Sequence, residues 1–164
     1  MILIALGGNL PSRAGTPAQT LDAALSEIAQ RNVKIVAVSS YYVTPAWPDP
    51  ADPLFVNAVA RIETKLSPSA LLALLHETET AFGRARSVRN APRTLDLDIL
   101  DYDGRVEAGS PDLPHPRMTE RSFVLVPLKD VAPNWQHPVD GRNIATLLAA
   151  LPEGERNLPR LPKR

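Results

Sequence analysis

The sequence predicts a single α+β domain of ferredoxin-like type, a mostly antiparallel sheet with helices packed on it. Alternating β-prone and helix-periodic segments follow the order β-α-β-β-α-β, which is typical of that sandwich. The 164 residues suffice for one ordinary core. The 17 prolines divide the chain into short elements and exclude long helices, and no internal repeat or low-complexity linker separates one part from another. We therefore expect residues 1–164 to form one domain.

The first strand and helix have clear boundaries in the sequence. Residues 2–6 are a continuous β-prone run that ends at Gly7-Gly8, which indicates a buried strand leading into a tight loop. From about residue 17 to 30, apolar residues recur with helical spacing. Thr16-Pro17 is a typical N-cap and first-turn pair for that helix.

Two more strands are expected on either side of a stiff loop. Residues 33–43 are rich in β-branched residues and tyrosine, which predicts a strand. Residues 44–53 include four prolines and predict a stiff loop, because each proline fixes its own φ and restricts the residue before it. Residues 55–63 alternate as a strand does, which places Phe55 and Asn57 on the same side.

A second helix and a further strand follow. Ser67-Pro68 predicts the start of a helix with a leucine stripe, and Gly83 predicts its end. Residues 84–93 form an arginine-rich loop before a strand at 95–102. Asp103-Gly104 then signals a hairpin turn.

The last third of the chain is expected to be helical and then extended. A proline-punctuated loop at 111–116 precedes a helical stretch near 117–131, and a short helix is predicted around 143–150. About residues 152–164 are rich in proline and arginine, and we expect an extended tail that is frayed.

Composition limits the classes of function. Lys plus Arg equals Asp plus Glu at 18 each, so no net charge directs the chain to nucleic acid or to an anionic membrane. The absence of cysteine excludes disulfides and thiolate metal sites and fits a reducing compartment. The apolar run at 1–6 is too short for a signal peptide or a membrane span. We expect a cytoplasmic monomer without nucleic-acid or membrane partners.

The most informative pattern is an acidic pair on the strand at 95–102. Residues i and i+2 of a strand point to the same face about 6.5–7 Å apart, so Asp96 and Asp98 present their carboxylates together, opposite Leu97. Two like charges side by side repel each other, and a cation between them removes the repulsion. Hard oxygen ligands favour Mg²⁺, which binds one or two carboxylates and keeps phosphate oxygens in its other positions.

An arginine cluster just before this strand strengthens the interpretation. Guanidinium groups match phosphate oxygens, so an acidic pair beside arginines is typical of a metal–polyphosphate site. The residues alone leave two alternatives open, a structural salt-bridge network and a solvated strand face. Gly7-Gly8 is not followed by the Gly-Lys-Ser/Thr ending of a Walker A loop. The cluster comprises Arg84, Arg86, Arg89 and Arg93.

Residues 89–100 resemble the signature of the 6-hydroxymethyl-7,8-dihydropterin pyrophosphokinase (HPPK) family of folate biosynthesis. Four further blocks agree in order and spacing, so the resemblance covers nearly the whole chain. These blocks are residues 6–10, 39–45, 55–58, and 113–117 with 121–123. The resemblance implies the ferredoxin-like fold and the transfer of diphosphate from ATP to the pterin hydroxymethyl group, with release of AMP.

The resemblance also implies roles for individual residues. Two Mg²⁺ ions would be carried by Asp96 and Asp98, which with Arg84 and Arg93 are the implied catalytic residues. The implied ATP contacts are Glu79, Arg84, Arg86, Arg93, His115 and Arg121. The implied contacts to 6-hydroxymethyl-7,8-dihydropterin are an aromatic sandwich of Phe55 and Phe123, and bonds to its polar edge from Asn57 and from groups at Thr44, Pro45 and Ala46.

Some positions allow a structural alternative, and some depart from the family. Either phenylalanine could be a core residue, and Glu79 could be a solvated helix residue. Asn90 stands where many members of the family have a tryptophan that covers the pterin, and Pro116 stands where they often have an aromatic. Trp47, in the proline-rich loop, could cover the site instead.

Two other classes of function remain as rivals. An RNA-binding sheet needs exposed aromatic residues and a basic face, whereas the strand at 95–102 presents Asp96 and Asp98. A two-metal phosphodiesterase or nuclease needs more metal ligands, and the sequence offers no obvious third one.

Overall fold

The computed structural model describes residues 1–85 and 90–162, and it contains one antiparallel sheet. The strand order is β2-β4-β1-β5, and β3 pairs with β4 beyond the end of β2. This arrangement confirms the α+β class and the order β-α-β-β-α-β, with β3 as a short addition. The strands are β1 (Ile2–Gly8), β2 (Val33–Val38), β3 (Tyr42–Thr44), β4 (Phe55–Thr64) and β5 (Asp96–Tyr102).

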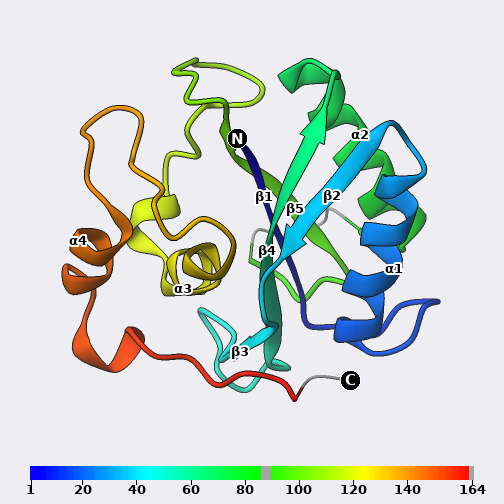
Figure 1. Ribbon diagram of the computed structural model, residues 1–164. Helices are drawn as coiled ribbons and strands as arrows, with labels where there is room; N and C mark the ends of the chain where they lie inside the picture. The colour runs from blue at the N-terminus through cyan, green and yellow to red at the C-terminus, as the bar shows by residue number, and fades with distance from the viewer. Residues whose placement is uncertain (86–89, 163–164) are drawn as a thin grey trace.

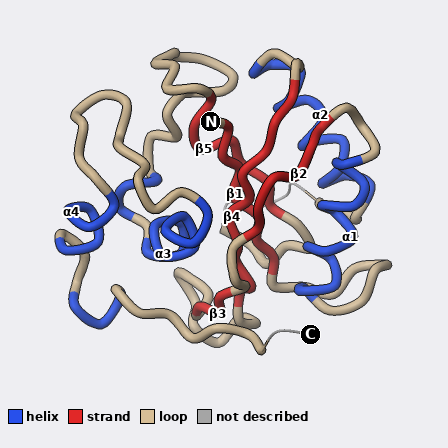
Figure 2. Tube along the Cα trace, in the orientation of Figure 1, coloured by secondary structure: helices blue, strands red, loops and turns tan. Residues whose placement is uncertain are grey.

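Helices cover both faces of the sheet, as Figures 1 and 2 show. Helices α1 and α2 pack on one face, and α3 packs on the other with α4 behind it. No helix in the described parts of the chain is long and apolar enough to cross a membrane. The helices are α1 (Pro17–Ala29), α2 (Pro68–Ala81), α3 (Ser122–Val131) and α4 (Ile144–Ala149), and the short 3-10 turns are η1 (Met118–Glu120) and η2 (Glu153–Glu155).

The predicted helix boundaries are confirmed by their caps. Thr16 forms a capping box with Gln19, in which each side chain bonds to the backbone N–H of the other residue, at 3.3 and 2.9 Å. Ser67 caps α2 by accepting from the N–H of Ala70 at 3.2 Å. Gly83 follows α2 with a φ of +84°, a conformation that glycine adopts without strain.

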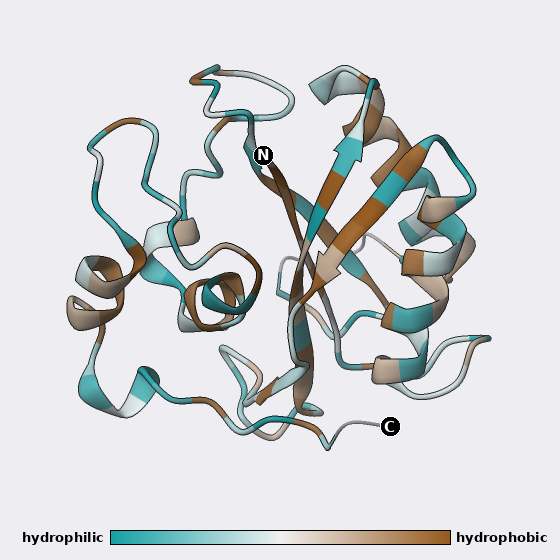
Figure 3. Cartoon of the chain, viewed as in Figure 1, coloured by the Kyte–Doolittle hydropathy of each residue, from teal (hydrophilic) through white to brown (hydrophobic). Residues whose placement is uncertain are grey.

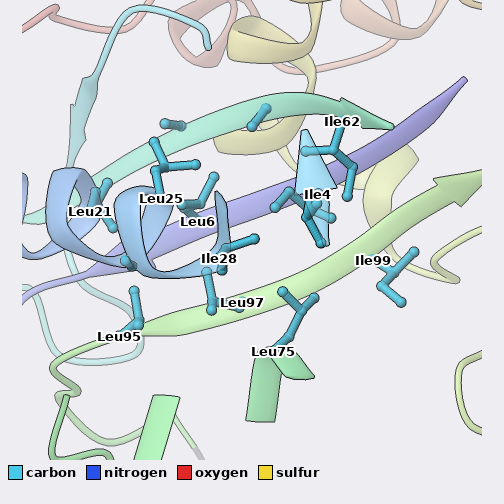
Figure 4. Packing of buried hydrophobic residues seen from close by; sticks show 14 of the residues in the cluster. Ile4, Leu6, Leu21, Leu25, Ile28, Ile62, Leu75, Leu95, Leu97 and Ile99 are labelled. Atoms are coloured by element: carbon cyan, nitrogen blue, oxygen red, sulfur yellow. The ribbon is translucent and has the colours of Figure 1, made fainter. Parts of the chain in front are cut away.

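Strand alternation divides the core into two layers. Side chains of even-numbered β1 residues meet α1 and α2, and Figure 4 shows Ile4 and Leu6 packed there against Leu21 and Ile28, with Leu97 from β5. Figure 3 accordingly shows β1 as hydrophobic in the part nearest the N-terminus. Because β5 continues this alternation, Asp96 and Asp98 lie on the α3 side. The layer on that side includes Leu3, Val59, Leu100, Leu125 and Leu128.

The strand expected at 33–43 is two strands, because the chain leaves the ladder at Ser39. The Ser39 hydroxyl accepts from the Val59 N–H at 3.0 Å, and the Ser39 N–H donates to the Val59 carbonyl at 2.9 Å. The hydroxyl therefore replaces one backbone acceptor, as serine side chains often do. Pairing with β4 resumes at Tyr42.

Two other expectations also need correction. Asp103 and Gly104 form a turn with positive φ, closed by the Arg105 N–H on the Tyr102 carbonyl at 3.0 Å, but no strand follows within residues 105–162. The C-terminal segment begins with the 3-10 turn η2 at Glu153–Glu155, and it is not frayed at residues 159–161. The Val43 N–H of β3 donates to the Pro159 carbonyl at 2.9 Å. The Leu161 N–H donates to the carbonyl of Tyr41, the residue before β3, at 2.8 Å.

Gly8 is required by a close approach between β1 and the start of β5. A Cβ at Gly8 would lie 2.5 Å from the Thr94 carbonyl oxygen, so the backbone would have to shift. We expect Gly8→Ala to lower the free energy of unfolding by about 1–3 kcal/mol, as overpacking does. Urea denaturation of Gly8→Ala checks this. Gly154→Ala is the control, since nothing lies within 4 Å of a Cβ placed at Gly154. Equal effects of the two substitutions would show that the contact is not restrictive.

Candidate active site

A pocket of about 150 Å³ opens on the α3 side of the sheet. The ends of β1, β4 and β5 form its floor, and the loops after β3 and before β5 form its walls. It brings together most of the residues that the sequence nominates, although they come from segments far apart in the chain. Of those, it is lined by Thr44, Pro45, Phe55, Asn57, Arg93, Asp96, Asp98, His115, Arg121 and Phe123.

Asp96 is neutralised by two arginines. Arg84 Nη1 donates to Asp96 Oδ1 at 3.1 Å, and Arg93 Nη1 donates to Oδ2 at 3.3 Å. Both guanidinium groups are mostly shielded from water, which strengthens these ion pairs. The predicted meeting of the acidic pair with the arginine cluster is therefore confirmed for Arg84 and Arg93. Arg86 and Arg89 lie outside the described residues.

Asp98 is compensated less completely. Within the described residues it contacts His115, whose Nε2 lies 3.9 Å from Asp98 Oδ2, and the Asp98 side chain is 41% exposed. Burial raises the pKa of Asp98, and the neighbouring charge of Asp96 raises it further, while His115, Arg121 and Arg84 oppose this shift. A second cation beside Asp98 would favour its ionised form.

Glu79 lies beneath the pocket and does not line it. Its carboxylate is 1% exposed and accepts from Arg84 Nη1 and from the Leu97 N–H, each at 3.2 Å. Arg84 Nη1 also donates to the Leu95 carbonyl at 2.8 Å. The alternative of a solvated helix residue is therefore wrong. Glu79 holds Arg84 against Asp96, and its contact with ATP stays a prediction.

Asn9 is a positioning residue that the sequence reasoning missed. Its side chain is buried, accepts from the Arg93 N–H at 2.8 Å and donates to the Pro53 carbonyl at 3.0 Å. The N–H groups of Asn9 and Leu10 both donate to the Arg93 carbonyl. Asn9 thus ties the loop that carries Arg93 to the proline-rich loop. The only signal in the sequence was a polar amide directly after Gly7-Gly8.

An aromatic and amide wall faces the acidic pair. Phe55 and Phe123 both line the pocket, and Phe123 remains exposed, so the alternative that they are core residues is wrong. Asn57 is buried and its Nδ2 donates to Thr44 Oγ1 at 2.8 Å. Gly7 leaves room for this amide, since a Cβ there would lie 2.9 Å from Asn57 Oδ1.

His115 and Arg121 form the basic rim of the pocket. The Arg117 N–H donates to His115 Nδ1 at 3.2 Å, so Nε2 faces Asp98. Burial lowers the pKa of His115, and the charge of Asp98 opposes that shift. Burial also lowers the pKa of Arg121, whose guanidinium lies 5.4 Å from the Phe123 ring centre. The rim can therefore offer a neutral histidine and a cation to an anionic ligand.

The structure also places three further residues that the sequence singled out. Asn90 lines the pocket with a φ of 61°. Trp47 also lines it, although its side chain is 70% exposed. Ala46 is buried and is not part of the lining.

The acidic pair fits a metal that is completed by its substrate. Within residues 1–85 and 90–162, no three His, Asp or Glu side chains gather into a closed metal site. Asp96 and Asp98 can supply two oxygen ligands, and Mg²⁺ commonly takes its other ligands from water and phosphate. The donor set therefore suits a metal–polyphosphate complex better than a protein-only metal site.

Comparison with known proteins identifies relatives along most of the chain. Residues 3–133 match the family model of 7,8-dihydro-6-hydroxymethylpterin-pyrophosphokinase (HPPK). The chain is 40% identical over 161 residues to the 2-amino-4-hydroxy-6-hydroxymethyldihydropteridine pyrophosphokinase of Pseudomonas aeruginosa, covering 96% of each chain. It is 44% identical over 131 residues to the enzyme of that name from Haemophilus influenzae, covering 79% of each.

Solved structures share the fold at much lower identity. The crystal structure of Plasmodium falciparum HPPK-DHPS matches with a TM-score of 0.64 at 13% identity. The match covers 89% of this chain and 43% of the Plasmodium chain, so this chain spans less than half of that protein. At this identity the likeness shows the fold alone.

Asp98 should destabilise the free protein. Its raised pKa means that ionised Asp98 lowers the free energy of unfolding above that pKa, and that the penalty vanishes as the pH falls through it. Water screens part of this effect, so we expect Asp98→Asn to raise the Tm by about 2 °C at pH 7.5. Thermal scans of both proteins from pH 4 to 8 check this, and the difference should disappear at the acid end. A lower Tm for Asp98→Asn at pH 7.5 would contradict the assignment.

Proposed function

We infer that this chain, which belongs to the 7,8-dihydro-6-hydroxymethylpterin-pyrophosphokinase (HPPK) family, transfers diphosphate from ATP to the hydroxymethyl group of 6-hydroxymethyl-7,8-dihydropterin. The products are AMP and the pterin diphosphate, and the reaction belongs to folate biosynthesis. One observation carries the assignment to this pocket. Asp96 and Asp98 lie on the same sheet face as Phe55 and Asn57, so a polyphosphate and a flat heterocycle can meet there.

On the phosphate side, Asp96 and Asp98 would hold Mg²⁺, and the family resemblance implies two ions. When bound there, Mg²⁺ would neutralise charge on the triphosphate and would help to align it with the attacking hydroxyl. Arg93, His115 and Arg121 would contact phosphate oxygens from the pocket rim. Arg84 reaches Asp96 from below, because Glu79 and the Leu95 carbonyl hold its guanidinium in place.

On the pterin side, Phe55 and Phe123 would stack on the two faces of the ring. Stacking on aromatic rings favours flat heterocycles and tolerates little tilt. Asn57 donates its Nδ2 to Thr44, which leaves Oδ1 free to accept from the amino edge of the pterin. Backbone groups of Thr44 and Pro45 would complete that edge, and Trp47 could cover it.

In the transfer step, the hydroxymethyl oxygen attacks the β-phosphorus of ATP. The bond between that phosphorus and the oxygen bridging to the α-phosphate breaks, and AMP leaves with the electron pair. The hydroxyl proton would pass to Asp98, or bound Mg²⁺ would lower the pKa of the hydroxyl itself. Closure of the arginine-rich loop and the proline-rich loop would exclude water, which would otherwise compete with the hydroxyl as the acceptor of the diphosphate.

The two rival classes fit the site less well. An RNA-binding sheet needs an open face, and here α1 and α2 cover one face while α3 covers the other. A metal-dependent nuclease needs further carboxylate or histidine ligands, which the described residues do not bring to the pair. We propose a monomer in the cytoplasm, since one chain supplies the whole pocket and the sequence has no cysteine.

Product analysis tests the reaction and the acidic pair together. We expect AMP and diphosphorylated pterin in equal amounts from Mg-ATP and 6-hydroxymethyl-7,8-dihydropterin. Asp96→Ala should lower kcat at least about 100-fold, because the Mg²⁺ that would stabilise negative charge in the transition state would lose one of its ligands. Asp140→Ala, an exposed aspartate paired with Arg142, is the matched control and should keep full turnover. Formation of ADP would contradict diphosphate transfer.

Binding of ATP should depend on the metal. We expect saturating ATP with Mg²⁺ to raise the Tm by several degrees, because a ligand that binds only the folded state stabilises it. ATP with EDTA should raise it by less than about 1 °C, since Asp96 and Asp98 then repel the triphosphate. Equal protection with and without the metal would argue against a metal-bridged complex.

A further inference from the structure

The C-terminal segment adds a short strand-like edge to β3. The Val43 N–H donates to the Pro159 carbonyl at 2.9 Å, and the Leu161 N–H donates to the Tyr41 carbonyl at 2.8 Å. Tyr42 and Arg160 face each other as an antiparallel bridge. Figure 1 shows this last part of the chain passing beside β3. Strand β3 therefore has β4 on one edge and residues 159–161 on the other.

Side chains link both the β3 region and the C-terminal segment to helix α3. Asp130 of α3 accepts from the Ser40 N–H at 3.0 Å and from the Tyr42 hydroxyl at 2.9 Å. Arg160 Nη2 lies 3.8 Å from Asp130 Oδ1, and the Arg160 guanidinium lies 5.4 Å from the centre of the Tyr42 ring. Leu161 packs against the core cluster on the α1 side. Within the described residues, the C-terminal segment is thus held by backbone bonds, the Arg160–Asp130 ion pair, the contact of Arg160 with the Tyr42 ring and the packing of Leu161.

Strand β3 leads directly into the pterin wall of the pocket. It is three residues long, and its last residue, Thr44, lines the pocket and accepts from Asn57 Nδ2. Such a short strand gains little stability from one ladder, and segments with few bonds open locally at low free energy. The second ladder, from residues 159–161, therefore sets how firmly Thr44 and Pro45 are placed.

We propose that residues 159–161 position the pterin subsite and raise its affinity for the substrate, although they do not touch the pocket. The proposal rests on the proposed function, which assigns the pterin to the wall of Phe55 and Asn57. The phosphate wall has an anchor of its own in Glu79, which holds Arg84 against Asp96, so ATP binding should be insensitive to the C-terminal segment. By linkage, pterin binding must in turn tighten the docking of residues 159–161.

A pair of substitutions at Leu161 separates the backbone bond from the side-chain contact. Leu161→Pro keeps an apolar side chain and removes the N–H that reaches the Tyr41 carbonyl. Leu161→Ala keeps the N–H and removes most of the apolar contact. We expect Leu161→Pro to raise the pterin KM about tenfold, a typical size for coupling between sites, with the ATP KM within about twofold of wild type. Leu161→Ala should raise the pterin KM less.

Hydrogen exchange supplies a readout that a merely structural tail would not change. We expect pterin with Mg²⁺ and α,β-methylene-ATP to slow exchange of the Leu161 and Val43 amides in the wild type. In Leu161→Pro, the Val43 amide should exchange faster in the free protein. Arg142→Ala, which removes an exposed arginine that pairs with Asp140, is the control and should match the wild type in both measurements.

Each contrary outcome has a distinct meaning. A pterin KM unchanged in Leu161→Pro, with faster Val43 exchange, overturns the positioning role and leaves the proposed function intact. An equal rise in both KM values also overturns it, because the effect would then be general. A wild type that forms no AMP overturns the proposed function, and the positioning role with it.

Discussion

The repulsion between Asp96 and Asp98 is the constraint on which the rest of the site depends. Strand alternation forces both carboxylates onto one face, and Arg84 and Arg93 donate hydrogen bonds to Asp96. The buried Glu79 carboxylate holds Arg84 in that position, so a charge outside the pocket determines the charge balance inside it. Among the described residues, Asp98 has a longer contact, with His115 Nε2 at 3.9 Å, and this side of the pair suits a divalent cation that arrives with a polyphosphate.

The sheet also explains how two unlike ligands meet. Residues of β4 and β5 that share the α3 face give an aromatic and amide wall and an acidic wall, with Gly7 of β1 between them. Glycine at position 7 lets the Asn57 side chain lie close to β1. Gly8 lets the Thr94 carbonyl, just before β5, lie close to β1. Asn9 then bonds to both loops that border the pocket. The pocket is therefore positioned by backbone contacts as much as by side chains.

The comparisons support the fold and the family, and the site geometry supports the roles proposed for single residues. Likeness at 13% identity establishes the fold, and the sequence relatives establish the family. The roles of single residues rest on chemistry in this chain, where Asn90 and Trp47 also line the pocket. The C-terminal segment lies outside the matched residues 3–133, so its contact with β3 had to come from the structure.

Local rules were enough for the parts of the molecule that depend on neighbours in the chain. Caps at Thr16 and Ser67, the alternation of β5, and the acidic pair beside Arg84 and Arg93 followed from spacing and residue type alone. The split of the strand at Ser39, the burial of Glu79, the bonds of Asn9 and the docking of residues 159–161 did not. Each depends on a partner between 18 and more than 100 residues away in the chain, and a periodic pattern carries no information about such contacts. The sequence thus determined which chemistry is present, and only the tertiary structure decided which groups meet, because burial and pairing are set by the packed sheet.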